Sequence, residues 1–447
     1  MALSGIQIYK MLPQTNCKDC GLPTCLAFAM KLAAKQAELD KCPHVSDEAR
    51  EKLAESAAPP VRLVTISANG REVKSGNEVV LFRHNKTFYN PAGIFIRVRD
   101  EQPMDEIKGT VEEAASYSVD YVGMTLTIDG FAVEATGGGN TFTSTVKGVL
   151  DTANLPLVLI AADPAVMAQG LEAAAGTRPL IYGATADNWE PFADLAKKHE
   201  TPMVIRAESL SSLAELTEKI KATGVEEIVL DPGVRDLKSS LALNTLIRRL
   251  ALKKNFRPLG FPIISFPGEC ADDEGMVSVA ATQAITKYGG FIVLDRFSPA
   301  TIYPLLALRT NIYTDPQKPI QVQPGVYEIN DPQADSPVMV TTNFSITYFS
   351  VANEVDGSGN PGWLLVADAE GMSVLTAWAA GKFDAERIAK AVKSADMENR
   401  VSHRKLVIPG HVSVLMGELE EELPGWEILV GPREAVDLPG YLKLWQA

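Results

Sequence analysis

Three features are scarce in this sequence of 447 residues, and each scarcity excludes a class of protein. Only one cysteine follows residue 42, which is not the pattern of a disulfide framework. No stretch reaches the roughly 18 uninterrupted apolar residues of a membrane-spanning helix, and the N-terminus lacks an apolar run of signal-peptide length. Basic residues number 42 against 56 acidic ones, and the charge of -14 argues against a nucleic-acid partner. We therefore expect a soluble, cytoplasmic protein with no membrane or nucleic-acid partner.

Histidine is also scarce, and its placement excludes the common zinc-enzyme motifs. The 5 histidines form no H-x-x-H or H-E-x-x-H pair. Apolar residues are present in ordinary amounts, at 46%, and can fill globular interiors. A chain of this length exceeds a single core, so we expect two or three domains.

Four of the five cysteines are concentrated in "NCKDCGLPTCLAFAMKLAAKQAELDKCP", residues 16–43. Cys17, Cys20, Cys25 and Cys42 have the spacing C-x2-C-x4-C-x16-C. Zinc sites usually have two separated C-x2-C pairs, whereas a tight loop with three thiolates and a returning fourth is typical of a cubane cluster. The spacing therefore predicts a 4Fe-4S cluster, with zinc, a 2Fe-2S cluster and a redox dithiol as less favoured alternatives.

The segments around these cysteines suggest a small domain of its own. The Ala-rich stretch 26–39 predicts a helix beside the cluster, and a second short helix is predicted at 46–56 with Ser46 as its N-cap. "SAAPP", residues 56–60, then predicts a linker that lets this domain reorient. The remaining cysteine, Cys270, lies in a loop and receives no role.

The middle of the chain alternates short apolar strands with amphipathic helices. Strands are predicted at 94–98, 121–126, 155–161, 179–184, 202–207, 227–232, 262–267 and 291–295. Helices are predicted at 105–118, 140–153, 165–175, 189–199, 209–223, 237–254, 274–288 and 299–312. This βα repetition predicts a TIM (β/α)8 barrel, because apolar strands joined by helical crossovers form a parallel sheet. Two hairpin-like runs before it, 61–70 and 77–90, are expected to plug or flank the N-terminal end of the barrel.

Polar residues follow several of these strands, at the face where TIM barrels carry their active sites. They are "GGGN" at 137–140, Asp163, Asp187, "DPGVRD" at 231–236, "GECADDEG" at 268–275 and "DRF" at 295–297. Asp and Asn in such loops also cap helices, and the glycine triplet lacks the lysine and the spacing of a phosphate loop. We therefore favour a scaffold role for the barrel over an active pocket.

A third region resumes the alternation after a proline-rich crossing that begins near Pro316. Strands are predicted at 337–342, 363–368, 405–410 and 426–432, and helices at 345–355, 373–380, 385–397 and 412–423. This order predicts a Rossmann-like, doubly wound α/β domain, which binds ligands at the carboxyl ends of its strands. The predicted domains are a cluster domain at 1–58, the barrel at 59–315 and the α/β domain at 316–447.

The order of these parts resembles the large (gamma) subunit of the corrinoid/iron-sulfur protein of the reductive acetyl-CoA pathway. The most specific pieces are "NCKDCGLPTC" with Cys42, "VTTNFSITYFSVANEV", "ADAEGMSVLTAW" and "EILVGPREA". The resemblance implies a 4Fe-4S cluster on the four cysteines and a cobalt corrinoid, a B12 derivative, in the C-terminal domain. It carries the corrinoid pocket over to Thr342, Thr347, Gly371, Met372, Ser373, Val374, Leu375, Thr376, Gly410, Gly431, Pro432 and Arg433.

The resemblance also implies a function and partners. The subunit would form a heterodimer with a small corrinoid/iron-sulfur protein subunit. Its cobalt would accept a methyl group from methyltetrahydrofolate through a separate methyltransferase and donate it to the nickel centre of acetyl-CoA synthase. The chain would then be a methyl carrier, a co-substrate in methyl transfer with no catalytic residue of its own. The cluster, fed by a low-potential electron donor, would reduce Co(II) to Co(I) for reactivation.

Two alternatives remain at this point. The chain is either a barrel methyltransferase that carries a cluster, or an electron-transfer or reductive-activation protein without a corrinoid. The sequence also departs from the B12-binding pattern D-x-H-x-x-G, since "DAEG" at 368–371 has no histidine. That absence is consistent with a base-off corrinoid that has no protein imidazole on cobalt.

Overall fold

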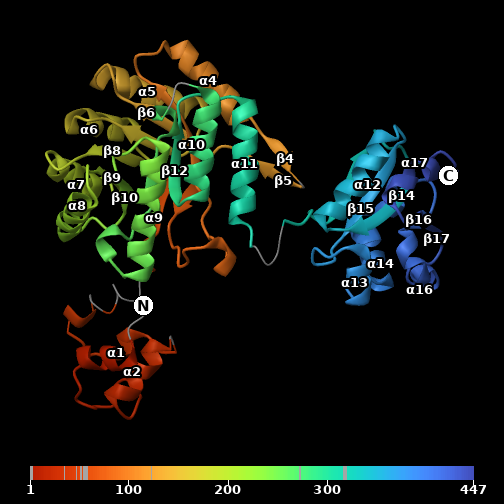
Figure 1. Cartoon of the computed structure of the whole chain (residues 1–447), viewed down its shortest axis with the longest axis horizontal. Coiled ribbons are helices and arrows are strands. Elements are labelled where there is room, and N and C mark those ends of the chain that lie inside the picture. The colour runs from red at the N-terminus through yellow and green to blue at the C-terminus, as the bar shows by residue number, and fades with distance from the viewer. Residues whose placement is uncertain are drawn as a thin grey trace. The chain divides into compact units, whose positions relative to one another are not determined.

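The computed structural model describes residues 4–34, 36–46, 48–50, 53, 59–121, 123–270, 273–315 and 320–447. The chain divides into two compact units, one of Met1–Tyr117 with Thr127–Tyr313 and the other of Ser118–Leu126 with Thr314–Ala447 (Figure 1). The second unit is therefore built from two separate segments of sequence. The domain boundaries expected near residues 58 and 316 stay predictions, because residues 54–58 and 316–319 lie outside the described part of the chain.

The cysteine-bearing head consists of short helices around a small apolar core. Its helices are α1 (Gly5–Met11), α2 (Cys25–Ala33) and the 3-10 helix η1 (Leu39–Lys41). Phe28 and Ala29 are buried in this core. The helix expected at 26–39 ends at Ala33, because the chain turns back there and the amide of Gln36 donates to the carbonyl of Lys31. Of the helix expected at 46–56, residues 48–50 and 53 are described and helical.

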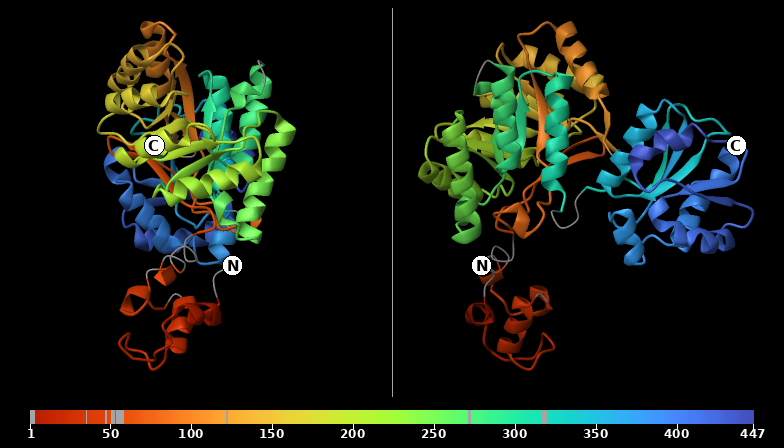
Figure 2. Two further views of the ribbon diagram at one scale, coloured as in Figure 1. Left: turned by 90° about the vertical axis from the view of Figure 1, so that its left-hand side faces the viewer. Right: turned by 45° about the vertical axis from the view of Figure 1, so that its right-hand side comes forward.

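Eight parallel strands close into a barrel in the order β10-β11-β12-β3-β6-β7-β8-β9, which confirms the predicted TIM barrel. They are β3 (Gly93–Arg99), β6 (Gly130–Glu134), β7 (Leu157–Ile160), β8 (Leu180–Ala184), β9 (Met203–Arg206), β10 (Ile228–Asp231), β11 (Ile263–Ser265) and β12 (Gly289–Leu294). The helices are α4 (Met104–Ser116), α5 (Gly139–Thr152), α6 (Pro164–Ala173), α7 (Trp189–Lys198), α8 (Leu210–Ala222), α9 (Leu237–Lys253), α10 (Glu274–Thr286) and α11 (Pro299–Tyr313), with η3 (Arg257–Leu259) and η4 (Pro267–Glu269) in the loops. The helices surround the strands, as Figure 2 shows from two directions.

One expected barrel strand is wrong. Residues 121–126 do not enter the barrel but belong to an antiparallel hairpin, β4 (Val119–Tyr121) and β5 (Met124–Leu126). The barrel strand is the next apolar run, β6, which is almost entirely buried. The hairpin instead packs Tyr121 and Met124 into the core of the second unit. Both runs look like strands in the sequence, and only long-range packing separates them.

A hairpin plugs the barrel, as expected for the first of the two runs. Its strands are β1 (Val64–Ala68) and β2 (Arg71–Ser75), and side chains such as Ile66 pack in the barrel interior. Asn69 and Gly70 join the strands, and both have positive φ (48° and 80°), as a two-residue hairpin turn requires. The second expected hairpin is wrong, since residues 77–90 are all described and contain only η2 (Arg83–Asn85) and no strand.

The second unit contains a five-stranded sheet in the order β13-β15-β14-β16-β17. Its strands are β13 (Gly325–Ile329), β14 (Val338–Thr342), β15 (Gly362–Ala367), β16 (Lys405–Ile408) and β17 (Glu427–Val430). Its helices are α12 (Ser345–Gly357), α13 (Val374–Ala379), α14 (Ala385–Ser394), α15 (Met397–Arg400), η5 (Gly410–Leu415), α16 (Met416–Glu422), η6 (Ala435–Asp437) and α17 (Leu438–Leu442). Four strands are parallel, and β15 and β16 lie on opposite sides of β14, so the order of connection switches beside β14.

The predicted doubly wound domain is thus confirmed, with two differences. Strand β13 lies in the stretch expected to be an irregular crossing, and it pairs antiparallel with β15. The helix expected at 385–397 is interrupted at Asp396, whose positive φ of 51° separates α14 from α15. Among the described residues, no helix combines the length and apolar character needed to cross a membrane.

Candidate cofactor sites

The four cysteines of the head lie on a tight loop, one helix start and one returning segment. Cys25 and Cys42 are buried in the head's core, Cys20 is half-buried, and Cys17 is exposed. Cys25 is the first residue of α2, where the unpaired amides of a helix N-terminus favour negative charge. Four free thiols gathered in one small domain are a donor set that fits an iron-sulfur cluster.

The loop before α2 is held in an unusual backbone conformation. Asn16, Lys18 and Gly21 all have positive φ (51°, 70° and 76°). Asn16 stabilises the loop, because its side-chain Oδ1 accepts from the amide of Cys25 at 2.8 Å and its own amide donates to Cys25 Sγ at 3.4 Å. An amide that donates to a cysteine sulfur is typical of cluster loops and tunes the cluster's potential.

A second side-chain contact lies beside the cysteines. His44 Nε2 lies 2.6 Å from Asp19 Oδ2, and both side chains are about half exposed. The hydrogen bond from His44, followed by one from the Cys17 thiol, lowers the pKa of the Asp19 carboxyl. One donor atom each from Cys17, Asp19 and His44 lie within 4.8 Å of one another.

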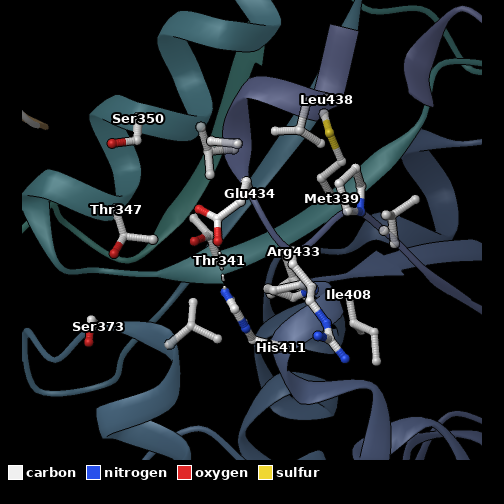
Figure 3. Close-up of a pocket in the computed structure, with 18 of the residues that line it drawn as sticks. Met339, Thr341, Thr347, Ser350, Ser373, Ile408, His411, Arg433, Glu434 and Leu438 are labelled. Carbon is white, nitrogen blue, oxygen red and sulfur yellow. Dashed lines mark ion pairs between the residues drawn. The ribbon is translucent and has the colours of Figure 1, made fainter. Parts of the chain in front are cut away.

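The second unit has a cavity of about 280 Å³ at the carboxyl ends of β14, β16 and β17, beside the switch in strand order. Open α/β sheets bind ligands in this crevice. Figure 3 shows Thr347, Ser350 and Ser373 on one side of the cavity and Met339 and Ile408 on the other. The cavity therefore combines an apolar floor with hydroxyls at its rim.

Two buried hydroxyls at the end of β14 lack a partner. Thr341 and Thr342 are 1% and 0% exposed, and neither Oγ1 has a hydrogen-bond partner among the residues that the structure describes. A buried hydroxyl without a partner costs about 1–3 kcal/mol. Thr341 lines the cavity, so a ligand there can supply the missing partner. The cavity thus fits a polar group that enters an otherwise apolar crevice.

Charged side chains also gather at the mouth of the barrel, and there the acidic side chains pair with the basic ones. Arg97, only 5% exposed, donates through Nη1 to Glu269 at 2.8 Å and through Nε to Asp295 at 2.5 Å. Arg235 binds Asp231 with both Nη atoms at 2.9 Å. Burial would raise the pKa of Glu269, but hydrogen bonds from the two arginines lower it.

Two aromatic side chains, Tyr182 and Phe266, join this network. Tyr182 donates to Asp231 at 2.6 Å, and burial followed by the Asp231 charge raises the pKa of the Tyr182 hydroxyl. The Arg97 and Arg235 guanidinium carbons lie over the Phe266 ring, at 5.6 and 5.0 Å from its centroid. The acidic and basic side chains of this network thus pair with one another, as expected for a scaffold.

Known proteins are similar to this chain over nearly its whole length. Residues 63–442 match a family model described as "CO dehydrogenase/acetyl-CoA synthase delta subunit", and residues 12–44 match one described as "Putative Fe-S cluster". The corrinoid/iron-sulfur protein large subunit of Moorella thermoacetica is 44% identical over 444 residues, 99% of each chain. The acetyl-CoA decarbonylase/synthase complex subunit gamma of Methanopyrus kandleri is 36% identical, over 99% of this chain and 97% of its own.

The chain belongs to the family of corrinoid/iron-sulfur protein large subunits. A solved dihydropteroate synthase of Thermus thermophilus aligns with 55% of this chain and 99% of its own, with 17% identity and a TM-score of 0.39, a likeness too distant to indicate function.

The pocket predicted for this large subunit coincides only in part with the cavity. Residues that line it as predicted are Thr347, Ser373, Val374, Leu375, Gly431, Pro432 and Arg433. Thr342, Gly371, Met372, Thr376 and Gly410 are not among the lining residues. The prediction did not include Thr341, Ser350, His411 and Glu434, which the structure brings to the lining. Which of these residues contact a corrinoid stays a prediction.

Two of the glycines outside the lining shape loops beside it. Gly371 has a φ of 72°, and its amide donates to Asn343 Oδ1 at 2.9 Å, so Asn343 holds this loop against β14. At Gly410, a Cβ would lie 2.6 Å from the carbonyl oxygen of Gly431. Only glycine lets the loops after β16 and β17 approach so closely.

His411 is the cavity residue that sequence reasoning had least reason to find. It follows β16 instead of standing in a D-x-H-x-x-G motif, and its Nε2 lies 3.7 Å from Glu434 Oε1. The pair is drawn as a dashed line in Figure 3. The carboxyl end of the strand was the available signal, since α/β sheets bind ligands at that edge. The large subunit therefore has an imidazole within the cavity lining.

Proposed function

We propose that this large subunit carries a methyl group in the acetyl-CoA pathway, with a cobalt corrinoid in the cavity of its second unit and a 4Fe-4S cluster on Cys17, Cys20, Cys25 and Cys42. The observation that carries the proposal is the cavity beside β14, with its buried, unpartnered Thr341 hydroxyl. Five free thiols also suit the reducing cytoplasm, where we place the protein.

The chemistry would come from the cofactors, and the chain would hold them. When bound, a corrinoid would supply a cobalt able to carry a methyl group from methyltetrahydrofolate, by way of a separate methyltransferase, to the nickel centre of acetyl-CoA synthase. A cluster on the four cysteines would supply the electron for reducing Co(II) to Co(I). Thr341 would donate its hydroxyl hydrogen to the ligand, and Thr347 and Ser373 would hydrogen-bond at the rim. Met339 and Ile408 would exclude water from the floor of the cavity.

We also propose a set of partners, supported by relatives that are named as subunits of an acetyl-CoA decarbonylase/synthase complex. The small corrinoid/iron-sulfur protein subunit, the methyltransferase, acetyl-CoA synthase and a low-potential electron donor are the proposed partners. A carrier must present its cofactor to several proteins in turn, which is consistent with the exposed apolar side chains around the cavity. Ile346 and Leu375, which line the cavity, are 66% and 47% exposed.

A metal count tests the proposal. The chain is co-expressed with the small subunit and purified under nitrogen, and we expect about four iron atoms and one cobalt per heterodimer, with broad visible absorption that bleaches on reduction. Iron without cobalt would support the electron-transfer alternative. Zinc in place of iron would refute the cluster.

Two further measurements separate the remaining alternatives. Turnover of methyltetrahydrofolate by the purified chain alone would support the barrel methyltransferase, which the paired charges of the barrel mouth argue against. We also propose that the corrinoid is base-off, without a protein imidazole on cobalt. Nitrogen superhyperfine coupling in the Co(II) EPR spectrum that disappears in His411→Gln would refute this proposal.

A further inference from the structure

Among the described residues of the head, one ion pair joins its two cysteine-bearing segments. Asp19 stands between Cys17 and Cys20, and His44 stands two residues after Cys42. The 2.6 Å contact between Asp19 Oδ2 and His44 Nε2 thus connects the three-cysteine loop to the segment that brings the fourth cysteine.

Both ends of this contact are fixed by their own backbone. On the loop side, the Gly21 amide donates to the carbonyl of Lys18 at 2.8 Å and closes a turn around Asp19. On the other side, the Cys42 amide donates to Leu39 at 3.0 Å, and Val45 is buried in the head's core. Pro43 restricts the backbone between Cys42 and His44. The backbone that carries each side chain of the pair is therefore held close to the neighbouring cysteine.

The exposure of the two side chains limits how much their pairing can stabilise the fold. At 49% and 51% side-chain exposure, His44 and Asp19 are screened by solvent, so their pairing contributes little to the stability of the fold. The core around Phe28 holds the head together without them. The consequence of the pair is therefore local, in the position of Cys42 and in the charge beside the cysteines.

We propose that Asp19 and His44 are positioning residues for the cluster: the pair holds the Cys42 segment in register with the Cys17–Cys20 loop, and the Asp19 carboxylate lowers the cluster's reduction potential. This inference rests on the proposed function, since it concerns the cluster that the four cysteines would hold. A negative charge near a centre that gains an electron disfavours the reduced form. A low potential is what the reduction of Co(II) requires.

The head offers a matched control. Asp40 pairs with Arg50 at 3.3 Å, in the same small domain and at the surface, and within the described part of the head this pair has no hydrogen bond to a cysteine. Asp40→Asn therefore removes the same charge from the head while the cysteine-bearing segments keep their connection. Asp19→Glu keeps the carboxylate and tests whether charge or exact geometry matters.

The experiment compares the heterodimer with its Asp19→Asn, His44→Gln, Asp19→Glu and Asp40→Asn variants. The readouts are iron per chain, the EPR spectrum of the reduced cluster, the rate of iron loss to a chelator, and the midpoint potential from an anaerobic titration. In Asp19→Asn we expect about a tenfold higher ratio of reduced to oxidised cluster at a fixed potential, about 59 mV for a one-electron couple. Iron loss should become several-fold faster in both Asp19→Asn and His44→Gln.

The control variants should behave differently. Asp40→Asn should match the unsubstituted protein in both readouts, and Asp19→Glu should keep its potential. A potential in Asp19→Asn that equals that of Asp40→Asn would overturn the inference. So would nitrogen coupling from His44 in the reduced cluster's EPR spectrum, because His44 would then be a ligand. An unsubstituted protein without iron would refute the proposed function itself, which the metal count shows before any variant is made.

Discussion

The substitution Thr341→Val tests whether the cavity in the second unit is a ligand site. Thr341 is 1% exposed, lines the cavity and has no hydrogen-bond partner for its hydroxyl among the described residues. Valine keeps the shape and removes the hydroxyl, so the penalty of about 1–3 kcal/mol for an unpartnered buried group disappears. We expect the protein without corrinoid to become more stable, by about 1 kcal/mol or more, in urea unfolding followed by circular dichroism.

Corrinoid affinity should change in the opposite direction. The ligand loses one hydrogen bond, worth about 0.5–1.5 kcal/mol, so its affinity should fall roughly two- to tenfold in a spectroscopic titration. Thr342 is the informative comparison, because successive residues of a strand point to opposite faces. Thr342→Val should also stabilise the protein but leave the affinity unchanged. If Thr341→Val lowers stability, or if Thr342→Val alone weakens binding, the assignment of the cavity is refuted.

Three further substitutions test other parts of the chain. Burial raises the pKa of the Glu78 carboxyl, so its contribution to stability is present at low pH and is lost as the pH rises through that raised value. Glu78→Gln should flatten this loss when urea unfolding is followed as the pH rises above the ordinary carboxyl range. Arg235→Met removes the arginine that pairs with the Asp231 carboxylate, which is 0% exposed, and should cost about 3–5 kcal/mol in urea unfolding with cobalt content unchanged. A loss below about 1 kcal/mol would contradict the importance of this pairing. Gly410→Ala places a Cβ 2.6 Å from a carbonyl oxygen, so it should lower the free energy of unfolding by about 1–3 kcal/mol and reduce cobalt content. Normal cobalt content would show that this loop does not shape the site.

Much of the fold could be predicted because its signals are local. The barrel strands are short apolar runs followed by helices with polar caps, and all but one lie where the sequence placed them. The exception, 121–126, contains strand β5 (Met124–Leu126), but this strand pairs with Val119–Tyr121 and the hairpin packs in the core of the second unit. Strand β13 was hidden for a similar reason, since Pro324 and the polar stretch before it suggested a loop. Partner choice depends on distant residues, and no local pattern encodes it.

Site residues marked by a local sequence pattern could also be predicted, whereas those that depend on side-chain direction could not. The four cysteines could be read from spacing alone, because a cluster needs its thiolates on a short loop. A ligand site could be predicted at the carboxyl ends of the strands, and Ser373 and residues 431–433, which were named for it, line the cavity. The choice between Thr341 and Thr342 could not be made from the sequence, because it depends on which face of the sheet each side chain occupies. The same limit hid His411, which reaches the cavity only through the turn after β16.

Because it includes the hairpin segment 118–126, the second unit is built from two separate segments of the sequence. Arg309, in the last turns of α11, donates through Nη2 to the carbonyl of Thr127 at 3.3 Å and pairs with Asp129. The chain re-enters the barrel unit at Thr127 and leaves it after Tyr313, four residues beyond Arg309. One side chain therefore anchors the segments next to both crossings. A single cut near residue 315 would separate Tyr327 and Tyr348 from the hairpin residues that pack on them, so the second unit cannot be defined as one continuous stretch of sequence.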